Sequence, residues 1–116
     1  FTGTIIVFVD GKTYSAGASI ARFFKEYGEA FIIGEETGTR YEGFAGGSSN
    51  KIILPNSQII FYLPRYHIKY QKSTLQMTTN RGLIPDFIIT PDKESWLTQT
   101  DTPLLMAIQK IQSQKD

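Results

Sequence analysis

The hydrophobic positions of the first third of the chain follow two different periods. The nearly continuous apolar, β-branched run Gly3–Val9 is typical of a strand buried on both faces in a parallel sheet. Residues 16–27 instead follow a helical period with one apolar stripe. That stripe consists of Ile20, Phe23, Phe24 and Tyr27. Gly28 is placed to end this helix, and a second apolar strand follows at 30–33. The pattern therefore predicts a strand–helix–strand unit with parallel strands.

The middle of the chain is predicted to contain a loop and a hairpin. Residues 34–50 are rich in glycine and polar side chains, which is typical of a long loop. Residues 51–54 and 58–63 are apolar and flank the turn signal Pro55-Asn56-Ser57, so we expect them to pair as antiparallel strands. The segment 66–70 alternates in a way that favours a further edge strand.

The last third of the chain is predicted to hold a connection, a short strand and a helix. Residues 71–81 show no strong period and are interpreted as a surface connection. Residues 86–90 contain a last short apolar strand, and Thr102-Pro103 begins a helix. The apolar face of that helix consists of Leu104, Leu105, Ile108 and Ile111.

Composition narrows the class of protein. The 116 residues suit one domain, and 41% hydrophobic with 20% charged residues is the profile of a globular protein. A net charge of +1 gives no reason to expect nucleic acid or a membrane surface as a partner, and no apolar run approaches the roughly 20 residues of a membrane span. The absence of cysteine excludes a disulfide scaffold and a thiolate metal site, and the scattered aspartates show no metal-ligand spacing. We therefore expect no metal and no cofactor.

Ser15 is the strongest candidate for chemistry. It lies where the first strand passes through a short polar turn into the helix at 16–27. The free N–H groups and the positive dipole end of a helix start would stabilise an alkoxide or an oxyanion beside it. The arrangement resembles a nucleophile elbow. The alternative is that Ser15 only caps the helix, which is a common role of serine.

Four sequence blocks, in order, resemble the tail-specific serine peptidases of family S41 and their relatives on the ClpP/crotonase fold. The blocks are Thr13-Tyr14-Ser15-Ala16-Gly17, Ile32-Ile33-Gly34-Glu35-Glu36-Thr37-Gly38, Leu54-Pro55-Asn56-Ser57 and Gly82-Leu83-Ile84-Pro85-Asp86. The resemblance implies an α/β fold of the ClpP/crotonase type. It also implies that residues 1–116 are the C-terminal portion of a peptidase S41 catalytic core.

The resemblance assigns roles to Ser15 and Ala16, and the chain differs from many family members at residue 40. It implies that Ser15 is the nucleophile and that the backbone N–H of Ala16 contributes to the oxyanion hole, with a second donor before Phe1. Many family members have a lysine base twenty-five residues after the serine, where this chain has Arg40. Arginine has only hydrogen-bond donors on its guanidinium and cannot act as a neutral base. The chain therefore looks closer to the tricorn-like branch, which uses an upstream histidine, although residues 78–81 lack the glutamate of that branch.

Other residues near these blocks are candidates for substrate binding or for support of the site. They are Thr37, Gly38, Arg40 and Glu36, with ordinary loop roles as the alternative in each case. Arg40 could bind the C-terminal carboxylate of a substrate in bidentate fashion. The adjacent Glu35 and Glu36 point in opposite directions on an extended chain, so they do not form a carboxylate pair.

Two further signals are weaker. His67 is the only histidine and lacks a partner, so a structural or solvent-facing role is favoured over a base. The stretch 43–49 suggests a phosphate loop, but the Gly-Lys-Ser/Thr ending and a following helix are absent, and we reject that interpretation.

The resemblance predicts a serine-type peptidase that acts on a protein or peptide substrate. The upstream part of the same protein would complete the site, and the bacterial periplasm or cell envelope is the implied location. One alternative is an inactive relative that binds a ligand or peptide, for which Arg40 and the missing carboxylate argue. A weaker alternative is an acyl-CoA-processing relative, for which the sequence shows no CoA-binding surface.

Overall fold

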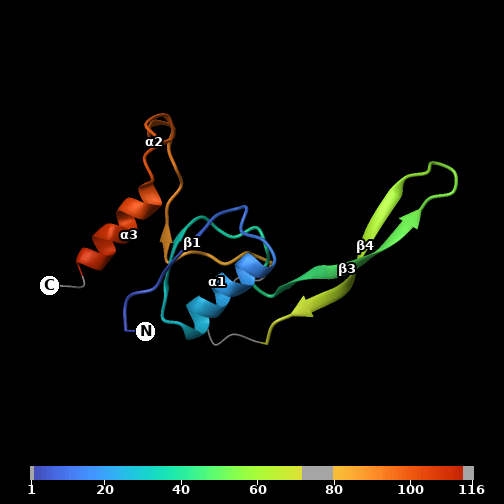
Figure 1. The fold of residues 1–116 in the computed structure, drawn as a ribbon, viewed down its shortest axis with the longest axis horizontal. Coiled ribbons are helices and arrows are strands. Elements are labelled where there is room, and N and C mark those ends of the chain that lie inside the picture. Colours follow the sequence, from blue (N-terminus) through green and yellow to red (C-terminus); the bar gives the residue numbers. More distant parts are fainter. Residues whose placement is uncertain (1, 72–79, 114–116) are drawn as a thin grey trace.

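The protein forms a small parallel sheet with a long separate hairpin (Figure 1). The computed structural model describes residues 2–71 and 80–113. Strands β1 (Ile6–Val9), β2 (Phe31–Gly34) and β5 (Phe87–Ile88) form the sheet, with β2 in the centre. Both neighbours of β2 run parallel to it, and the register runs from Ile6 opposite Phe31 to Val9 opposite Gly34. The protein is therefore mixed α/β with a parallel sheet, as the sequence predicts.

The strand–helix–strand unit is confirmed, but β1 is less buried than predicted. Helix α1 (Ala16–Tyr27) connects β1 to β2 with the expected bounds. The expectation of a strand buried on both faces is wrong for β1, because β1 lies at the sheet edge and the side chain of Phe8 is 48% exposed. The central strand β2 fits that expectation, since Ile32 and Ile33 are fully buried.

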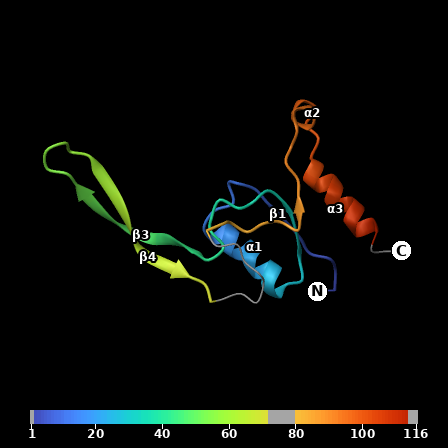
Figure 2. The ribbon, with the colours of Figure 1, turned by 180° about the vertical axis from the view of Figure 1, so that it is seen from behind.

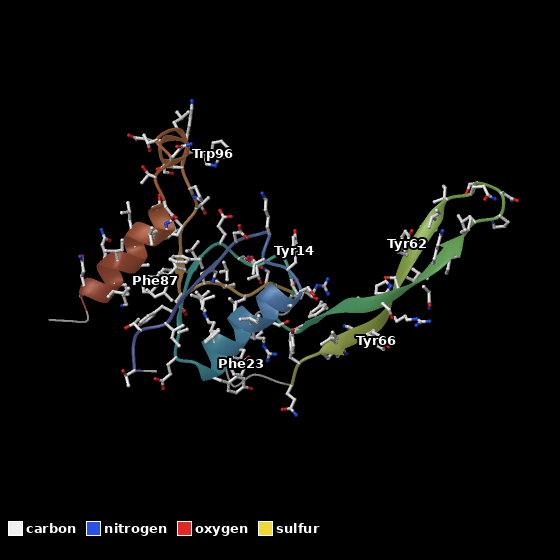
Figure 3. The ribbon with its side chains drawn as sticks, viewed as in Figure 1. Tyr14, Phe23, Tyr62, Tyr66, Phe87 and Trp96 are labelled. Carbon is white, nitrogen blue, oxygen red and sulfur yellow. The ribbon has the colours of Figure 1, made fainter. Side chains whose placement is uncertain are left out.

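Helix α1 packs on the sheet through small residues. Ala18 and Ala21 are buried, and Ala21 belongs to the core cluster, against which Phe24 is partly buried. Short side chains allow the helix backbone to approach the strands closely. The apolar stripe predicted for α1 is therefore not its core face, because Ile20, Phe23 and Tyr27 are all more than half exposed. Figure 3 shows one of them, Phe23, on the outer side of α1.

Gly28 ends α1 for a reason that differs from the expected one. Its N–H donates to the carbonyl of Phe24, but its φ is −104°, and the left-handed residue is Glu29 with a φ of 49°. A Cβ at position 28 would lie 2.8 Å from Cδ1 of Phe24 and 3.0 Å from its carbonyl oxygen. Glycine is needed here for space rather than for a positive φ.

The predicted hairpin is present and is much longer than expected. Strand β3 (Gly43–Ile53) pairs antiparallel with β4 (Ile60–Lys69) around the turn at 55–57. The expectation of a loop through residue 50 is wrong, because β3 begins at Gly43, and the expected edge strand at 66–70 is largely the end of β4. An irregularity between Gly46 and Ser49 accommodates the glycine-rich sequence. Both ribbon views show this hairpin reaching away from the sheet (Figures 1 and 2).

The C-terminal segment adds two helices. The short α2 (Lys93–Leu97) was not predicted, and the Asp92 carboxylate caps it by accepting the N–H of Ser95 at 2.7 Å. Helix α3 (Thr102–Gln112) begins where expected, and Asp101 caps it. The residues of its predicted apolar face are all exposed, and Ala107 is its buried residue.

The expected connection at 71–81 lies almost wholly outside the described residues. None of the helices formed by the described residues is long and apolar enough to cross a membrane.

Candidate functional site

Ser15 lies directly before α1 in an unusual backbone conformation. Its φ is 49° and its ψ is −118°, a combination that is costly for any residue with a side chain beyond hydrogen. Its hydroxyl makes no capping hydrogen bond to the helix start, and the residue is exposed. The interpretation of Ser15 as a side-chain helix cap is therefore not supported. A strained residue with a free hydroxyl is instead typical of a functional position.

The turn that presents Ser15 is fixed by Asp10 and Thr13. The Asp10 carboxylate accepts the N–H of Lys12 at 2.9 Å and the hydroxyl of Thr13 at 3.1 Å. In return, the N–H of Asp10 donates to the Thr13 hydroxyl at 3.0 Å, and the N–H of Thr13 donates to the Asp10 carbonyl at 2.9 Å. The polar sequence after β1 therefore closes its own turn.

Both sides of the Ser15 backbone are held. Its N–H donates to the hydroxyl of Thr39 at 2.7 Å, and its carbonyl accepts the N–H of Ser19 at 3.0 Å and the hydroxyl of Ser19 at 2.9 Å. Ala16 is the first helical residue, so its N–H has no acceptor within the helix. The amide of Ala16 is therefore suited to donate to an oxyanion, whereas the amide of Ser15 is occupied.

The segment Glu36–Thr39 connects this turn to the core. The Thr37 hydroxyl accepts the N–H of Leu83 at 2.8 Å and donates to the carbonyl of Thr39 at 3.0 Å. Thr37 and Thr39 are both buried, with 4% and 8% exposure. A Cβ on Gly38 would lie 2.2 Å from Cε1 of Tyr14 and 2.5 Å from the Gly11 carbonyl oxygen. The lack of a side chain at Gly38 therefore lets the two loops touch beside Tyr14 (Figure 3).

Glu36 anchors the other end of this segment. Its carboxylate accepts the N–H of Gly82 at 2.7 Å and forms an ion pair with the Arg81 guanidinium. The Arg81 hydrogen bond, followed by the Gly82 N–H, lowers the pKa of Glu36 from 4.5 to about 2. Glu36 is therefore a charged structural anchor and not a proton acceptor near neutral pH.

Glu35 lies in different surroundings from Glu36, as the extended chain predicted. It lines a cavity of about 450 Å³ together with Val9, Gly34 and Ile89, at the carboxyl ends of the sheet strands. Asp10 and Asp101 also line this cavity, but their carboxylates are engaged by the adjacent turn and the α3 cap. No group of histidine, cysteine, aspartate or glutamate within residues 2–71 and 80–113 is arranged to hold a metal ion.

Arg40 and His67, the two candidates with basic side chains, form no hydrogen bond with Ser15 in the described part of the chain. Arg40 is exposed, forms a backbone bridge with Gly82, and makes no ion pair within the described ranges. His67 lies on β4 opposite Ala45 and is exposed. Among the described residues, no titratable side chain hydrogen-bonds the Ser15 hydroxyl.

Sequence reasoning missed two residues that contact this site. Thr39 accepts the Ser15 N–H, and the Tyr70 hydroxyl shares a short hydrogen bond with that of Ser19. These partners are 24 and 51 residues apart in sequence, in segments where no periodic pattern relates them. The sequence carries no signal that would have identified either contact.

Comparison with known proteins gives one positive result. A family model described as Peptidase family S41 matches residues 1–89, which includes β1, α1, β2, the hairpin and β5. No curated protein matches the chain.

Proposed function

The chain belongs to peptidase family S41, and we propose that it hydrolyses peptide bonds with Ser15 as the nucleophile. Family membership implies a serine peptidase with a protein substrate. The observation that carries the assignment of Ser15 is its strained backbone, with φ at 49°, combined with an exposed hydroxyl that does not cap α1.

The proposed reaction is acyl transfer to Ser15 followed by hydrolysis. The hydroxyl oxygen forms a bond to the substrate carbonyl carbon while a base takes its proton, and the Ala16 N–H donates to the oxyanion. The carbon–nitrogen bond then breaks, and the base returns the proton to the leaving amine. Water attacks the acyl-enzyme by the same route, which releases the acid and restores Ser15.

The base is proposed to come from the part of the protein before residue 1. Arg40 occupies the position of the family lysine, and a guanidinium, which has only hydrogen-bond donors, does not accept the serine proton. A histidine supplied upstream, as in the tricorn-like branch, would fit the absence of a base hydrogen-bonded to Ser15 among the described residues. The exposed Arg40 would be free to bind a substrate carboxylate.

A fluorophosphonate probe tests the nucleophile in the intact protein. We expect intact-mass analysis to show one probe adduct, and we expect the Ser15→Ala variant to lose both the adduct and peptidase activity. Ser49→Ala is the matched control and should keep the adduct, because Ser49 is an exposed residue of the hairpin strand β3, opposite Pro64. An adduct that persists in Ser15→Ala would show that another residue is the nucleophile.

The alternative is a ligand-binding relative without peptidase activity. The observation that favours it is that no base contacts Ser15 in the described part of the chain. A folded intact protein that is not labelled, under conditions that label a control serine hydrolase, would support this alternative.

The resemblance further supports a location in the bacterial periplasm or envelope, which cell fractionation would test.

A further inference from the structure

We propose that Thr39 is a positioning residue whose hydroxyl holds the Ser15 N–H and so keeps the nucleophile in its left-handed backbone conformation. This inference rests on the proposed role of Ser15. Neither the family match nor the sequence assigns a role to Thr39.

The Ser15 conformation needs an external partner. A non-glycine residue at a φ of 49° and a ψ of −118° is disfavoured and persists only where its surroundings hold it. The carbonyl side is held by Ser19 within the same helix start, but the N–H side has one acceptor, the Thr39 hydroxyl at 2.7 Å. Without that acceptor, the peptide between Tyr14 and Ser15 is free to rotate toward a negative φ. Such a rotation would move the Ser15 hydroxyl.

Thr39 is itself held firmly enough to act as this partner. It is 8% exposed, and its carbonyl accepts the hydroxyl of Thr37 at 3.0 Å. The Thr37 hydroxyl in turn accepts the N–H of Leu83, a residue that is 1% exposed within the core cluster. The nucleophile is therefore connected to the core through the hydrogen bonds of two threonines, Thr39 and Thr37.

The contact also determines which amide faces a substrate. The Ser15 and Ala16 N–H groups are neighbours at the start of α1, and either could donate to an oxyanion. Thr39 occupies the first, which leaves the second as the donor at this helix start. Loss of the Thr39 hydroxyl would disturb the oxyanion donor together with the nucleophile.

Two variants of the intact protein separate the hydroxyl of Thr39 from its side-chain volume, and a third variant is a control. Thr39→Val keeps the shape and removes the hydroxyl, whereas Thr39→Ser keeps the hydroxyl. We expect Thr39→Val to lower kcat and the rate of fluorophosphonate labelling about 10- to 100-fold, with little change in KM, because misplacement by about 1 Å has effects of this size. We expect Thr39→Ser to stay within about threefold of the wild type. Thr98→Val is the control and should also stay within about threefold, because it removes a threonine hydroxyl that bonds Glu94 and Thr100 at the end of α2.

Labelling of Thr39→Val at the wild-type rate would overturn the inference. An equal loss in Thr39→Ser would also overturn it, since the methyl group and not the hydroxyl would then matter. If Thr39→Val does not fold, Thr39→Ala provides the hydroxyl deletion with a smaller side chain.

A stability cycle tests the contact even if the intact protein has no peptidase activity. Ser15 relieves backbone strain if it rotates after the Thr39 hydroxyl is removed, whereas glycine has no such strain to relieve. We therefore expect Thr39→Val to lower the denaturation midpoint more in a Ser15→Gly background than in the wild type. Strictly additive shifts would overturn the positioning role. Absence of labelling in the wild type would instead contradict the proposed function.

Discussion

At the scale of single residues, the charged carboxylate of Glu36 connects two segments of the described structure. Its carboxylate binds both Arg81 and the Gly82 N–H, and this contact joins the loop after β2 to the segment that leads into β5. The side chains of Glu36 and Arg81 are 31% and 54% exposed, so solvent and salt screen the ion pair. The hydrogen bond from the Gly82 N–H to the Glu36 carboxylate is less screened, and it holds the same two segments together.

This contact predicts a pH dependence of stability. The pKa of Glu36 is about 2 in the folded chain and near 4.5 when the chain is unfolded, so the unfolded state binds more protons between these values. The contribution of Glu36 to stability is therefore complete above about pH 5 and is lost as the pH falls from about 4.5 to 2. Denaturation of the wild type and of Glu36→Gln at pH 7 and pH 3 should show a smaller acid-induced loss in the variant. Equal losses would contradict the assigned role.

Residue-scale prediction from sequence succeeded where the signal was local. The position of Ser15 between an apolar strand and a helix follows from the chain around it, and the structure has that arrangement. Thr39 could not be found in this way, because its contact with Ser15 joins two loops that only the parallel pairing of β1 and β2 brings together.

At the scale of elements, Gly38 marks the closest approach between the loops that follow β1 and β2. We predict that Gly38→Ala lowers the free energy of unfolding by about 1–3 kcal/mol, because the added methyl group overlaps the Gly11 carbonyl oxygen as well as the movable Tyr14 ring. Chemical denaturation of the intact protein measures this change.

Gly11 provides the matched control on the facing loop. A Cβ there meets nothing within 4 Å, so Gly11→Ala should change stability by no more than about 0.5 kcal/mol. Similar losses in the two variants would show that the loops do not meet at Gly38.

For helix α1, the sequence predicts the bounds better than the buried face. The bounds of α1 follow from its period and agree with the structure, but the buried side is the small-residue side with Ala18 and Ala21. An amphipathic pattern shows that a helix has an apolar side, and it does not show which surface covers that side. The glycine-rich start of β3 was mistaken for a loop because its pairing depends on β4, which lies far along the chain.

At the scale of the whole molecule, the described chain is extended and exposes much apolar surface. Its radius of gyration is 18.2 Å, against about 13 Å for a compact domain of this length. Apolar residues lie on both faces of the hairpin, since Ile53 pairs with Ile60 and the adjacent Ile52 pairs with Phe61. All four side chains are more than 40% exposed.

This surface predicts the behaviour of residues 1–116 when they are produced alone. We expect strong binding of the dye ANS and concentration-dependent association, because large exposed apolar patches promote both. The double variant Ile53→Thr/Ile60→Thr, which changes one cross-strand pair, should reduce both signals. Lys51→Gln, an exposed polar position on β3, should reduce neither. A monomer that does not bind the dye would contradict this prediction.

The strained backbone of Ser15 has a consequence for evolution and engineering. A glycine at position 15 would relieve the left-handed conformation, so a selection that rewards stability alone favours loss of the hydroxyl. Only a selection that also requires the hydroxyl would retain serine there. A library screened for heat resistance without an activity step is therefore expected to enrich Ser15→Gly and to discard the proposed chemistry.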